Sequence, residues 1–170
     1  MGAFSDFTQY AKETGARLSS QPLLFETTKR LDVTQQELFN YVSDFDRASE
    51  WIIGAKKSWT DNSEAEAPGE VGAVRVIVSG ASTLVKERVK AYEAPRMLAY
   101  SANDEAFLGL CFDHLGVMTF EPHPDGGTVI CWLAYGRLAS NPVKGWVGKK
   151  LFQVALSRGM KNLERRFAPR

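Results

Sequence analysis

A series of six strand-like segments between residues 55 and 138, with no helical segment among them, most constrains the fold of this chain. The segments are rich in β-branched and aromatic residues, and clusters such as "EAEAPGE", "EAPR" and "PHPDGG" separate them. Such a series predicts an antiparallel meander, because parallel strands need long crossover connections that are usually helical. A further strand is predicted at residues 23–33, which makes about seven strands in all.

A long helix is predicted to close the chain, from Pro142 to Phe167. Asn141 is a suitable N-cap, and proline is favoured at the first position of a helix. The apolar residues of this segment form two adjacent stripes: Trp146, Val147, Leu151, Val154 and Ala155 in one, and Phe152, Leu156, Met160, Leu163 and Phe167 in the other. A helix with so broad an apolar side needs a large surface to cover, which the meander provides.

Two shorter helices are predicted between the first strand and the meander. Thr34 with Glu37 has the pattern of a capping box at the start of "TQQELFNYVSDF", and "DRASEWI" is predicted to form a second short helix that ends near Gly54. We therefore expect an α+β fold in which a curved antiparallel sheet wraps the long helix and encloses a hydrophobic cavity. Residues 22–170 should form this single domain, and residues 1–21 an amino-terminal extension that is partly helical.

Composition argues against several classes of function. The chain of 170 residues has a formal net charge of +1, which gives no electrostatic reason to bind nucleic acid. No apolar run approaches the roughly 20 residues of a membrane-spanning helix, so no stable membrane insertion is expected. Residues 1–20 lack the basic and apolar regions of a secretory signal, and we expect a cytoplasmic protein that is a monomer or a homodimer.

The two cysteines are expected to be thiols. If "DGG" closes a hairpin, Cys111 lies roughly 20 Å along its strand from the residue that faces Cys131, too far for a disulfide. Because His114 and His123 are the only histidines, no metal-ligand spacing such as C-x-x-C or H-x-x-x-H occurs. We expect neither a metal site nor a cofactor.

The order of these elements resembles the helix-grip superfamily, also called SRPBCC or START-like, and in particular its polyketide cyclase/dehydrase-like branch. The resemblance covers about residues 22–168 and includes the segments "VSDFDRASEWI", "ERVKAYEAPRMLAYS" and "VMTFEPHPDGGTVICW". It implies a central cavity that binds lipids, sterols, quinones, plant hormones or polyketides. It also implies that a minority of relatives are aromatase/cyclases or hydrolases.

Glu87 is the most unexpected residue of the meander. In "TLVKERVKAYE" it lies on the apolar side of a predicted strand, where a carboxylate is seldom without a partner. If residues 79–82 form the preceding turn, Val78 pairs with Thr83. This register places five valines on one face with Glu87: Val74, Val76, Val78, Val85 and Val89.

Four interpretations of Glu87 remain open. It is a buried carboxylate bonded to Tyr100 or another hydroxyl, a polar group that faces a ligand, a residue at a frayed strand end, or a general acid or base. If Tyr92 pairs with Met97, Tyr100 lies beside Val89 and close to Glu87. A mostly apolar cavity with a few polar groups is typical of small-ligand sites.

Other candidates for the cavity wall are aromatic residues and a histidine. His114 is either a proton shuttle or a satisfied strand side chain, and Trp51 is either at the cavity mouth or in the core. Trp132 and Tyr135 point to opposite faces of one strand, so only one of them lines the cavity. The apolar loop at residues 104–112 is either a flap over the cavity or part of the core.

Two charged features are expected to face solvent. Arg75 alternates with the valines of its strand and should therefore point away from the cavity. The lysines and arginines of the last helix are interspersed along it, which is typical of a solvated face, although an anionic membrane surface is an alternative partner.

The sequence thus predicts a protein that binds or transports a hydrophobic or amphipathic small molecule, such as a lipid, an isoprenoid or a polyketide-like aromatic. The predicted ligand-binding residues are Glu87, Tyr100, Val74, Val76, Val85, Val89, Trp51, Trp132 and His114. The alternative is a cyclase/aromatase- or hydrolase-type enzyme in which Glu87, Tyr100 and His114 orient a substrate and move protons. A second alternative is a protein-interaction module that docks a partner through the amino-terminal segment or the last helix.

Overall fold

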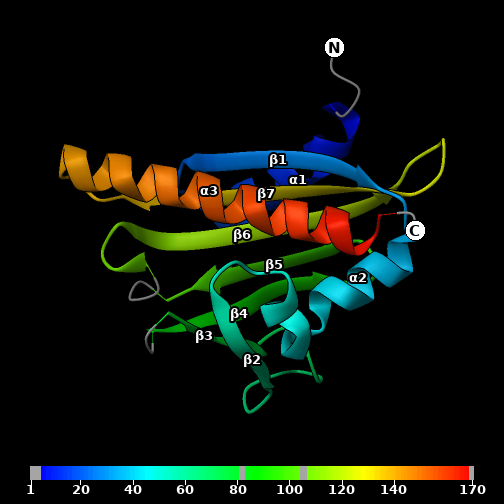
Figure 1. Ribbon diagram of the computed structural model, residues 1–170, viewed down its shortest axis with the longest axis horizontal. Coiled ribbons are helices and arrows are strands. Elements are labelled where there is room, and N and C mark those ends of the chain that lie inside the picture. The colour runs from blue at the N-terminus through cyan, green and yellow to red at the C-terminus, as the bar shows by residue number, and fades with distance from the viewer. Residues whose placement is uncertain (1–4, 81–82, 104–106, 169–170) are drawn as a thin grey trace.

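A seven-stranded antiparallel sheet in the order β1-β7-β6-β5-β4-β3-β2 forms the body of the protein in a computed structural model (Figure 1). The structure describes residues 5–80, 83–103 and 107–168. The strands are β1 (Leu23–Leu31), β2 (Ala55–Asp61), β3 (Val74–Ser79), β4 (Thr83–Glu93), β5 (Met97–Ala102), β6 (Cys111–Pro122) and β7 (Thr128–Leu138). The meander predicted for residues 55–138 is confirmed, and β1 completes the sheet by pairing with β7.

The long helix α3 (Pro142–Arg166) lies across one face of the sheet, beside β1 and β7 (Figure 1). The Asn141 side chain accepts hydrogen bonds from the backbone N–H groups of Val143 and Lys144, both at 3.1 Å. Pro142 occupies the first turn, where its missing N–H group is not needed. The predicted start of the helix is therefore confirmed.

Two short helices, α2 (Gln35–Ser43) and the 3₁₀ helix η1 (Phe45–Glu50), follow β1. Thr34 is the N-cap of α2, and its hydroxyl accepts a hydrogen bond from the Glu37 N–H at 3.3 Å, as the capping-box pattern predicted. The apolar side of α2 packs into the same core as α3. The predicted helix-grip architecture, an antiparallel sheet around a long carboxy-terminal helix, is confirmed.

The helix α1 (Ser5–Leu18) packs on the opposite face of the sheet, over β6 and β7 (Figure 1). Ala11 is fully buried there in a second, smaller core on the outer side of the sheet. Gly15 permits the close approach, because the ring of Tyr135 lies where a side chain at that position would begin. The strands β6 and β7 are thus buried on both faces, which explains their nearly continuous apolar sequences.

The outward side of α3 differs from the prediction. The stripe that contains Phe152 and Leu156 is buried, but the other stripe faces solvent. A helix that lies on a sheet buries one side, and Gly148 brings the helix backbone itself against the fold near the Leu110 carbonyl oxygen. The exposed fractions of the large apolar residues on the outward side are Val143 70%, Trp146 63%, Leu151 54% and Val154 45%.

Cys111 and Cys131 are both buried and form no disulfide, so the prediction of two thiols is confirmed. Burial raises the pKa of Cys131 to about 11. Within the described part of the chain, no helix is long and apolar enough to cross a membrane. The same residues contain no group of three or more His, Cys, Asp or Glu side chains placed to hold a metal ion.

Candidate functional site

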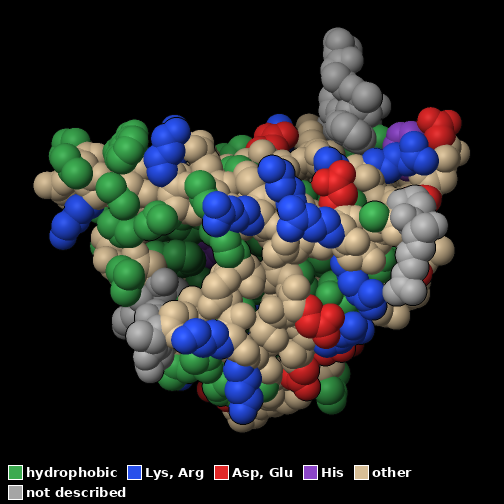
Figure 2. All heavy atoms as spheres, in the orientation of Figure 1, with side chains coloured by type: hydrophobic (Ala, Val, Ile, Leu, Met, Phe, Trp, Pro, Cys, Tyr) green, Lys and Arg blue, Asp and Glu red, His purple; other side chains and the backbone are tan. Residues whose placement is uncertain are grey.

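A cavity of about 270 Å³ lies between the sheet and α3. Side chains of β3 to β7 form its floor, α3 forms one wall, and residues 52–53 and 107–110 contribute the remainder. Figure 2 shows the molecule hollowed beside the amino-terminal half of α3, where hydrophobic side chains gather. Most of the wall is apolar, and its polar and charged side chains include Arg75, Glu87, Tyr100 and His114.

The pairing of β3 with β4 differs by one residue from the predicted register. Ser79 remains in β3 and pairs with Thr83 instead of entering the turn, so Arg75 stands directly opposite Glu87. A shift of one residue turns every side chain of a strand to the other face. Arg75, which we expected in solvent, is therefore 1% exposed and lines the cavity.

The same shift corrects the positions of two predicted ligand contacts. Val74 and Val76 face away from the cavity, on the outer surface of the sheet, and Ile77 lines the cavity in their place. The stretch "VRVIV" has apolar residues on both faces, so its alternation could not select one of them. The sequence signal that indicates the observed register is the opposite charge of Arg75 and Glu87, which can pair across the two strands.

Arg75 and Glu87 form a buried ion pair in the cavity wall. Arg75 Nε lies 2.5 Å from Glu87 Oε2, and the two side chains are 1% and 11% exposed. The guanidinium group also lies against three aromatic rings, with Cζ 4.9–5.6 Å from their centroids: Phe45, Trp51 and Tyr100. Cation–π contacts of this kind favour a positive charge where water is excluded. The partner of Glu87 is thus an arginine, and not the hydroxyl considered from the sequence.

Two further donor atoms of Arg75, Nη1 and Nη2, have no acceptor in hydrogen-bonding geometry among the described residues. Both atoms are buried, and the Arg75 side chain lies close enough to the Tyr100 hydroxyl to offset part of the rise in the pKa of Tyr100. A buried donor without a partner costs about 1–3 kcal/mol, more when the group is charged. Arg75 is also one of the residues that line the cavity, so its guanidinium group lies in the cavity wall.

His114 lines the same cavity from β6 and is 4% exposed. The rings of Tyr100, Phe107 and Phe152 surround it, with centroid distances of 5.1–5.9 Å. Burial, with a smaller contribution from the positive charge of Arg75, lowers the pKa of His114 to about 3. The imidazole is therefore neutral near pH 7, and neither of its nitrogens bonds to a described residue.

Tyr100 and Trp132 form a hydrogen-bonded pair at the cavity floor. Trp132 Nε1 donates to the Tyr100 hydroxyl at 3.1 Å, and burial together with the negative charge of Glu87 raises the pKa of Tyr100. Gly116 pairs with Tyr100 across β5 and β6, and a side chain there would collide with the tyrosine ring. Trp132 is the residue of its strand that faces the cavity, because Tyr135 packs under α1.

The remaining predicted residues divide between the cavity and the core. Val85 lines the cavity, whereas Val89 and Trp51 are buried next to it in the main core. Of the predicted flap, Phe107, Leu108 and Leu110 contribute to the cavity wall, and residues 104–106 lie outside the described residues. Whether any of these side chains contacts a ligand stays a prediction.

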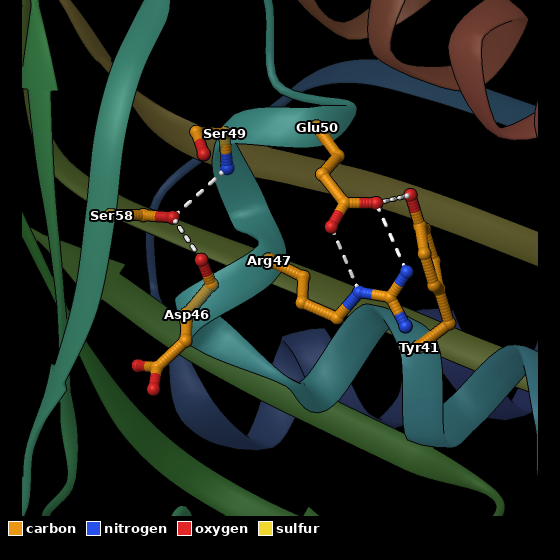
Figure 3. A network of polar contacts seen from close by, with 6 residues as sticks. All are labelled: Tyr41, Asp46, Arg47, Ser49, Glu50 and Ser58. Carbon is orange, nitrogen blue, oxygen red and sulfur yellow. Dashed lines mark hydrogen bonds and ion pairs between the residues drawn. The ribbon is translucent and has the colours of Figure 1, made fainter.

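A hydrogen bond attaches η1 to α2 (Figure 3). Glu50 accepts two hydrogen bonds from the Arg47 guanidinium, at 2.9 and 3.1 Å, and one from the Tyr41 hydroxyl at 3.0 Å. The positive charge of Arg47 lowers the pKa of Glu50, chiefly through this hydrogen bond. The carboxylate thus stays ionised and joins the two helices.

A second set of hydrogen bonds attaches η1 to β2 (Figure 3). The Ser58 hydroxyl accepts from the Ser49 N–H and donates to the Asp46 carbonyl, each at 3.0 Å. The two sets together hold η1 on both sides. Residues 52 and 53, which line the cavity, follow this helix in the chain.

The fold and the cavity together define a helix-grip protein with a mostly apolar internal site. Residues 22–168 match the family described as "Polyketide cyclase / dehydrase and lipid transport", and the chain belongs to this family. The resemblance to the polyketide cyclase-like branch of the SRPBCC superfamily is therefore confirmed. No curated protein matches the sequence.

Solved structures share this fold at low sequence identity. The XoxI protein from Bacillus cereus is 15% identical with a TM-score of 0.68, over 84% of this chain and 94% of that chain. A protein from Thermobifida fusca is 19% identical with a TM-score of 0.66, over 84% and 91%. The di-domain ARO/CYC StfQ from the steffimycin biosynthetic pathway is 16% identical with a TM-score of 0.66, over 96% of this chain and 56% of StfQ.

Proposed function

We propose that this protein binds a hydrophobic small molecule that carries a neutral oxygen group, such as a carbonyl or a hydroxyl. The mostly apolar wall of the cavity supports the hydrophobic part of this proposal. The observation that carries the rest is Arg75, whose Nη1 and Nη2 atoms are buried in that wall without an acceptor among the described residues. An oxygen atom of the ligand would accept hydrogen bonds from them.

The charges around Arg75 favour a neutral oxygen group over an anionic one. Glu87 already balances the guanidinium, and His114 is neutral near pH 7 because its pKa is about 3. A carboxylate or phosphate would therefore place an unbalanced charge in a mostly apolar site, at a cost of several kcal/mol. A carbonyl or hydroxyl oxygen adds no net charge.

Filling the cavity should weaken the binding of an apolar fluorescent probe. Val85 lines the cavity, whereas Val78 lies on the neighbouring strand and faces the opposite side of the sheet. We expect Val85→Phe to weaken binding of N-phenyl-1-naphthylamine roughly tenfold or more, because the added ring occupies the cavity. Val78→Phe is the matched control and should bind the probe as the wild type does. Fluorescence titration measures both affinities.

Equal probe affinities in Val85→Phe and Val78→Phe, with both proteins folded by circular dichroism, would contradict the proposal. A loss only in Val78→Phe would place the binding surface on the other face of the sheet.

A cyclase- or aromatase-type reaction is the second candidate function. It is favoured by the family description and by the convergence of Glu87, Tyr100 and His114 on one cavity. Against it, acid–base catalysis is most efficient when the pKa of the group lies near the working pH, and the pKa of His114 is about 3. Turnover of a linear polyketide-like substrate that is lost in Glu87→Gln, while this variant remains folded by circular dichroism, would favour the enzyme over the binding protein.

A further inference from the structure

The outer face of α3 exposes several large apolar side chains. This outer face comprises Val143, Trp146, Lys150, Leu151, Val154 and Arg158, all of which are exposed. Residues four apart in a helix lie one above another, so Trp146, Lys150 and Val154 form one row that continues to Arg158. Figure 2 shows hydrophobic side chains gathered over the amino-terminal half of α3, with basic side chains among and beside them.

Basic residues are concentrated in the same helix. Residues 142–166 contain seven Lys and Arg residues and one acidic residue, Glu164, so α3 has a formal charge of +6 in a chain whose total is +1. Of the basic residues, Lys150 and Arg158 belong to the apolar row itself. Exposed Trp, Leu and Val side chains with interspersed basic residues are the pattern of a helix that lies in a membrane interface.

The outer face of α3 is continuous with the mouth of the cavity. Leu151 belongs both to the outer face and to the cavity wall, and Leu108, which is 76% exposed, lines the cavity from the segment that precedes β6. An apolar molecule that leaves a bilayer at this surface would therefore meet the apolar side chains of Leu151 and Leu108 beside the cavity.

The charge of α3 distinguishes among the partners that could cover this face. A symmetric contact with a second copy would bring Lys150 and Arg158 close to the same residues of the other copy, which is unfavourable. A bilayer with anionic headgroups provides both an apolar layer for Trp146 and negative charge for the basic row.

We propose that the outer face of α3, together with Leu108, docks on the surface of an anionic lipid bilayer and places the mouth of the cavity against the lipid. The helix lies in the headgroup region and does not span the bilayer. Docking in this way needs no ligand in the cavity, so its test is independent of the test of ligand binding.

Vesicle co-sedimentation of the full chain tests this proposal. The wild type should bind vesicles of equal parts phosphatidylcholine and phosphatidylglycerol more tightly than phosphatidylcholine vesicles, and added salt should weaken the binding. Lys150→Gln with Arg158→Gln should weaken it about 25-fold, since each basic residue near an anionic bilayer contributes roughly fivefold. Trp146→Ala should weaken it roughly tenfold through lost apolar contact.

The matched control is the double variant Lys86→Gln and Lys90→Gln, which removes the same charge from exposed positions on the outer face of β4. It should bind anionic vesicles within about twofold of the wild type. Equal losses in the two double variants, or no preference of the wild type for anionic vesicles, would overturn the proposal. Light scattering that detects a dimer abolished by Trp146→Ala, without vesicle binding, would overturn it in favour of a second copy.

Discussion

Replacing Arg75 by methionine is expected to lower the free energy of unfolding by about 3–5 kcal/mol, because it leaves the Glu87 carboxylate buried without its partner. The ion pair is 1% and 11% exposed and is surrounded by aromatic rings, so little water is available to replace the guanidinium. Methionine retains much of the apolar bulk of the arginine stem, which limits the cavity left behind. Equilibrium unfolding in urea at pH 7 measures the change.

The double variant Arg75→Met and Glu87→Met separates the lost charge balance from lost packing. A buried ion pair replaced by apolar residues of similar volume is often neutral or stabilising, so the double variant should recover most of the loss and lie within about 1–2 kcal/mol of the wild type. A loss below about 1 kcal/mol in Arg75→Met would contradict the buried pair. A double variant as unstable as the single one would attribute the effect to packing.

The stability of the wild type is expected to fall on acidification because of His114. Burial lowers the pKa of this imidazole to about 3, whereas in the unfolded chain it is about 6.5. The folded state therefore holds the neutral form, and its stability is unaffected by His114 above pH 6.5. As the pH falls from 6.5 toward 3, the unfolded state binds a proton that the folded state does not. At pH 4.5 this proton binding lowers the free energy of unfolding by about 2.5 kcal/mol.

Replacing His114 by phenylalanine removes this dependence. Between pH 7.5 and pH 4.5 the wild type should lose stability that His114→Phe retains. The free energy of unfolding of the variant relative to that of the wild type should therefore rise by about 2.5 kcal/mol. At pH 7.5 the variant should already be more stable by about 1–2 kcal/mol, since both imidazole nitrogens are buried without a partner among the described residues. The measurement is urea unfolding at both pH values.

His114→Gln is the control for the titration, because it is polar but does not titrate. It should show the same change with pH as His114→Phe but no gain at pH 7.5. A wild type whose pH dependence matches both variants would contradict a neutral buried imidazole.

The parts of the fold that could be predicted from sequence are those with local signals. Thr34 and Asn141 mark helix starts through side-chain hydrogen bonds to backbone groups only two or three residues away. The turns at "EAPR" and "PHPDGG" are short, and strands joined by a short turn usually pair as neighbours. The strands on either side of each turn are neighbours in the sheet. Element order and architecture follow from such signals, and both were predicted.

The polar centre of the cavity could not be predicted, because it depends on long-range geometry. The strand of Arg75 has apolar residues on both faces, so its sequence does not fix its register with β4. The pairing of Ser79 with Thr83 sets this register and places Arg75 opposite Glu87. The environment of His114 combines Phe107 and Phe152 from two segments far apart along the chain. Periodicity likewise gave no means to tell which of the two stripes of α3 faces the sheet.

The central claim is that Arg75 recognises a neutral oxygen inside an apolar cavity, and a pair of ligands tests it most directly. Benzophenone and diphenylmethane have nearly the same shape but differ in one carbonyl group. Their affinities can be measured by displacement of N-phenyl-1-naphthylamine from the wild type and from the double variant Arg75→Met and Glu87→Met. We expect the preference for the ketone over the hydrocarbon to be roughly tenfold greater in the wild type than in the double variant. An equal preference for benzophenone over diphenylmethane in the wild type and in the double variant would contradict recognition of the oxygen by Arg75.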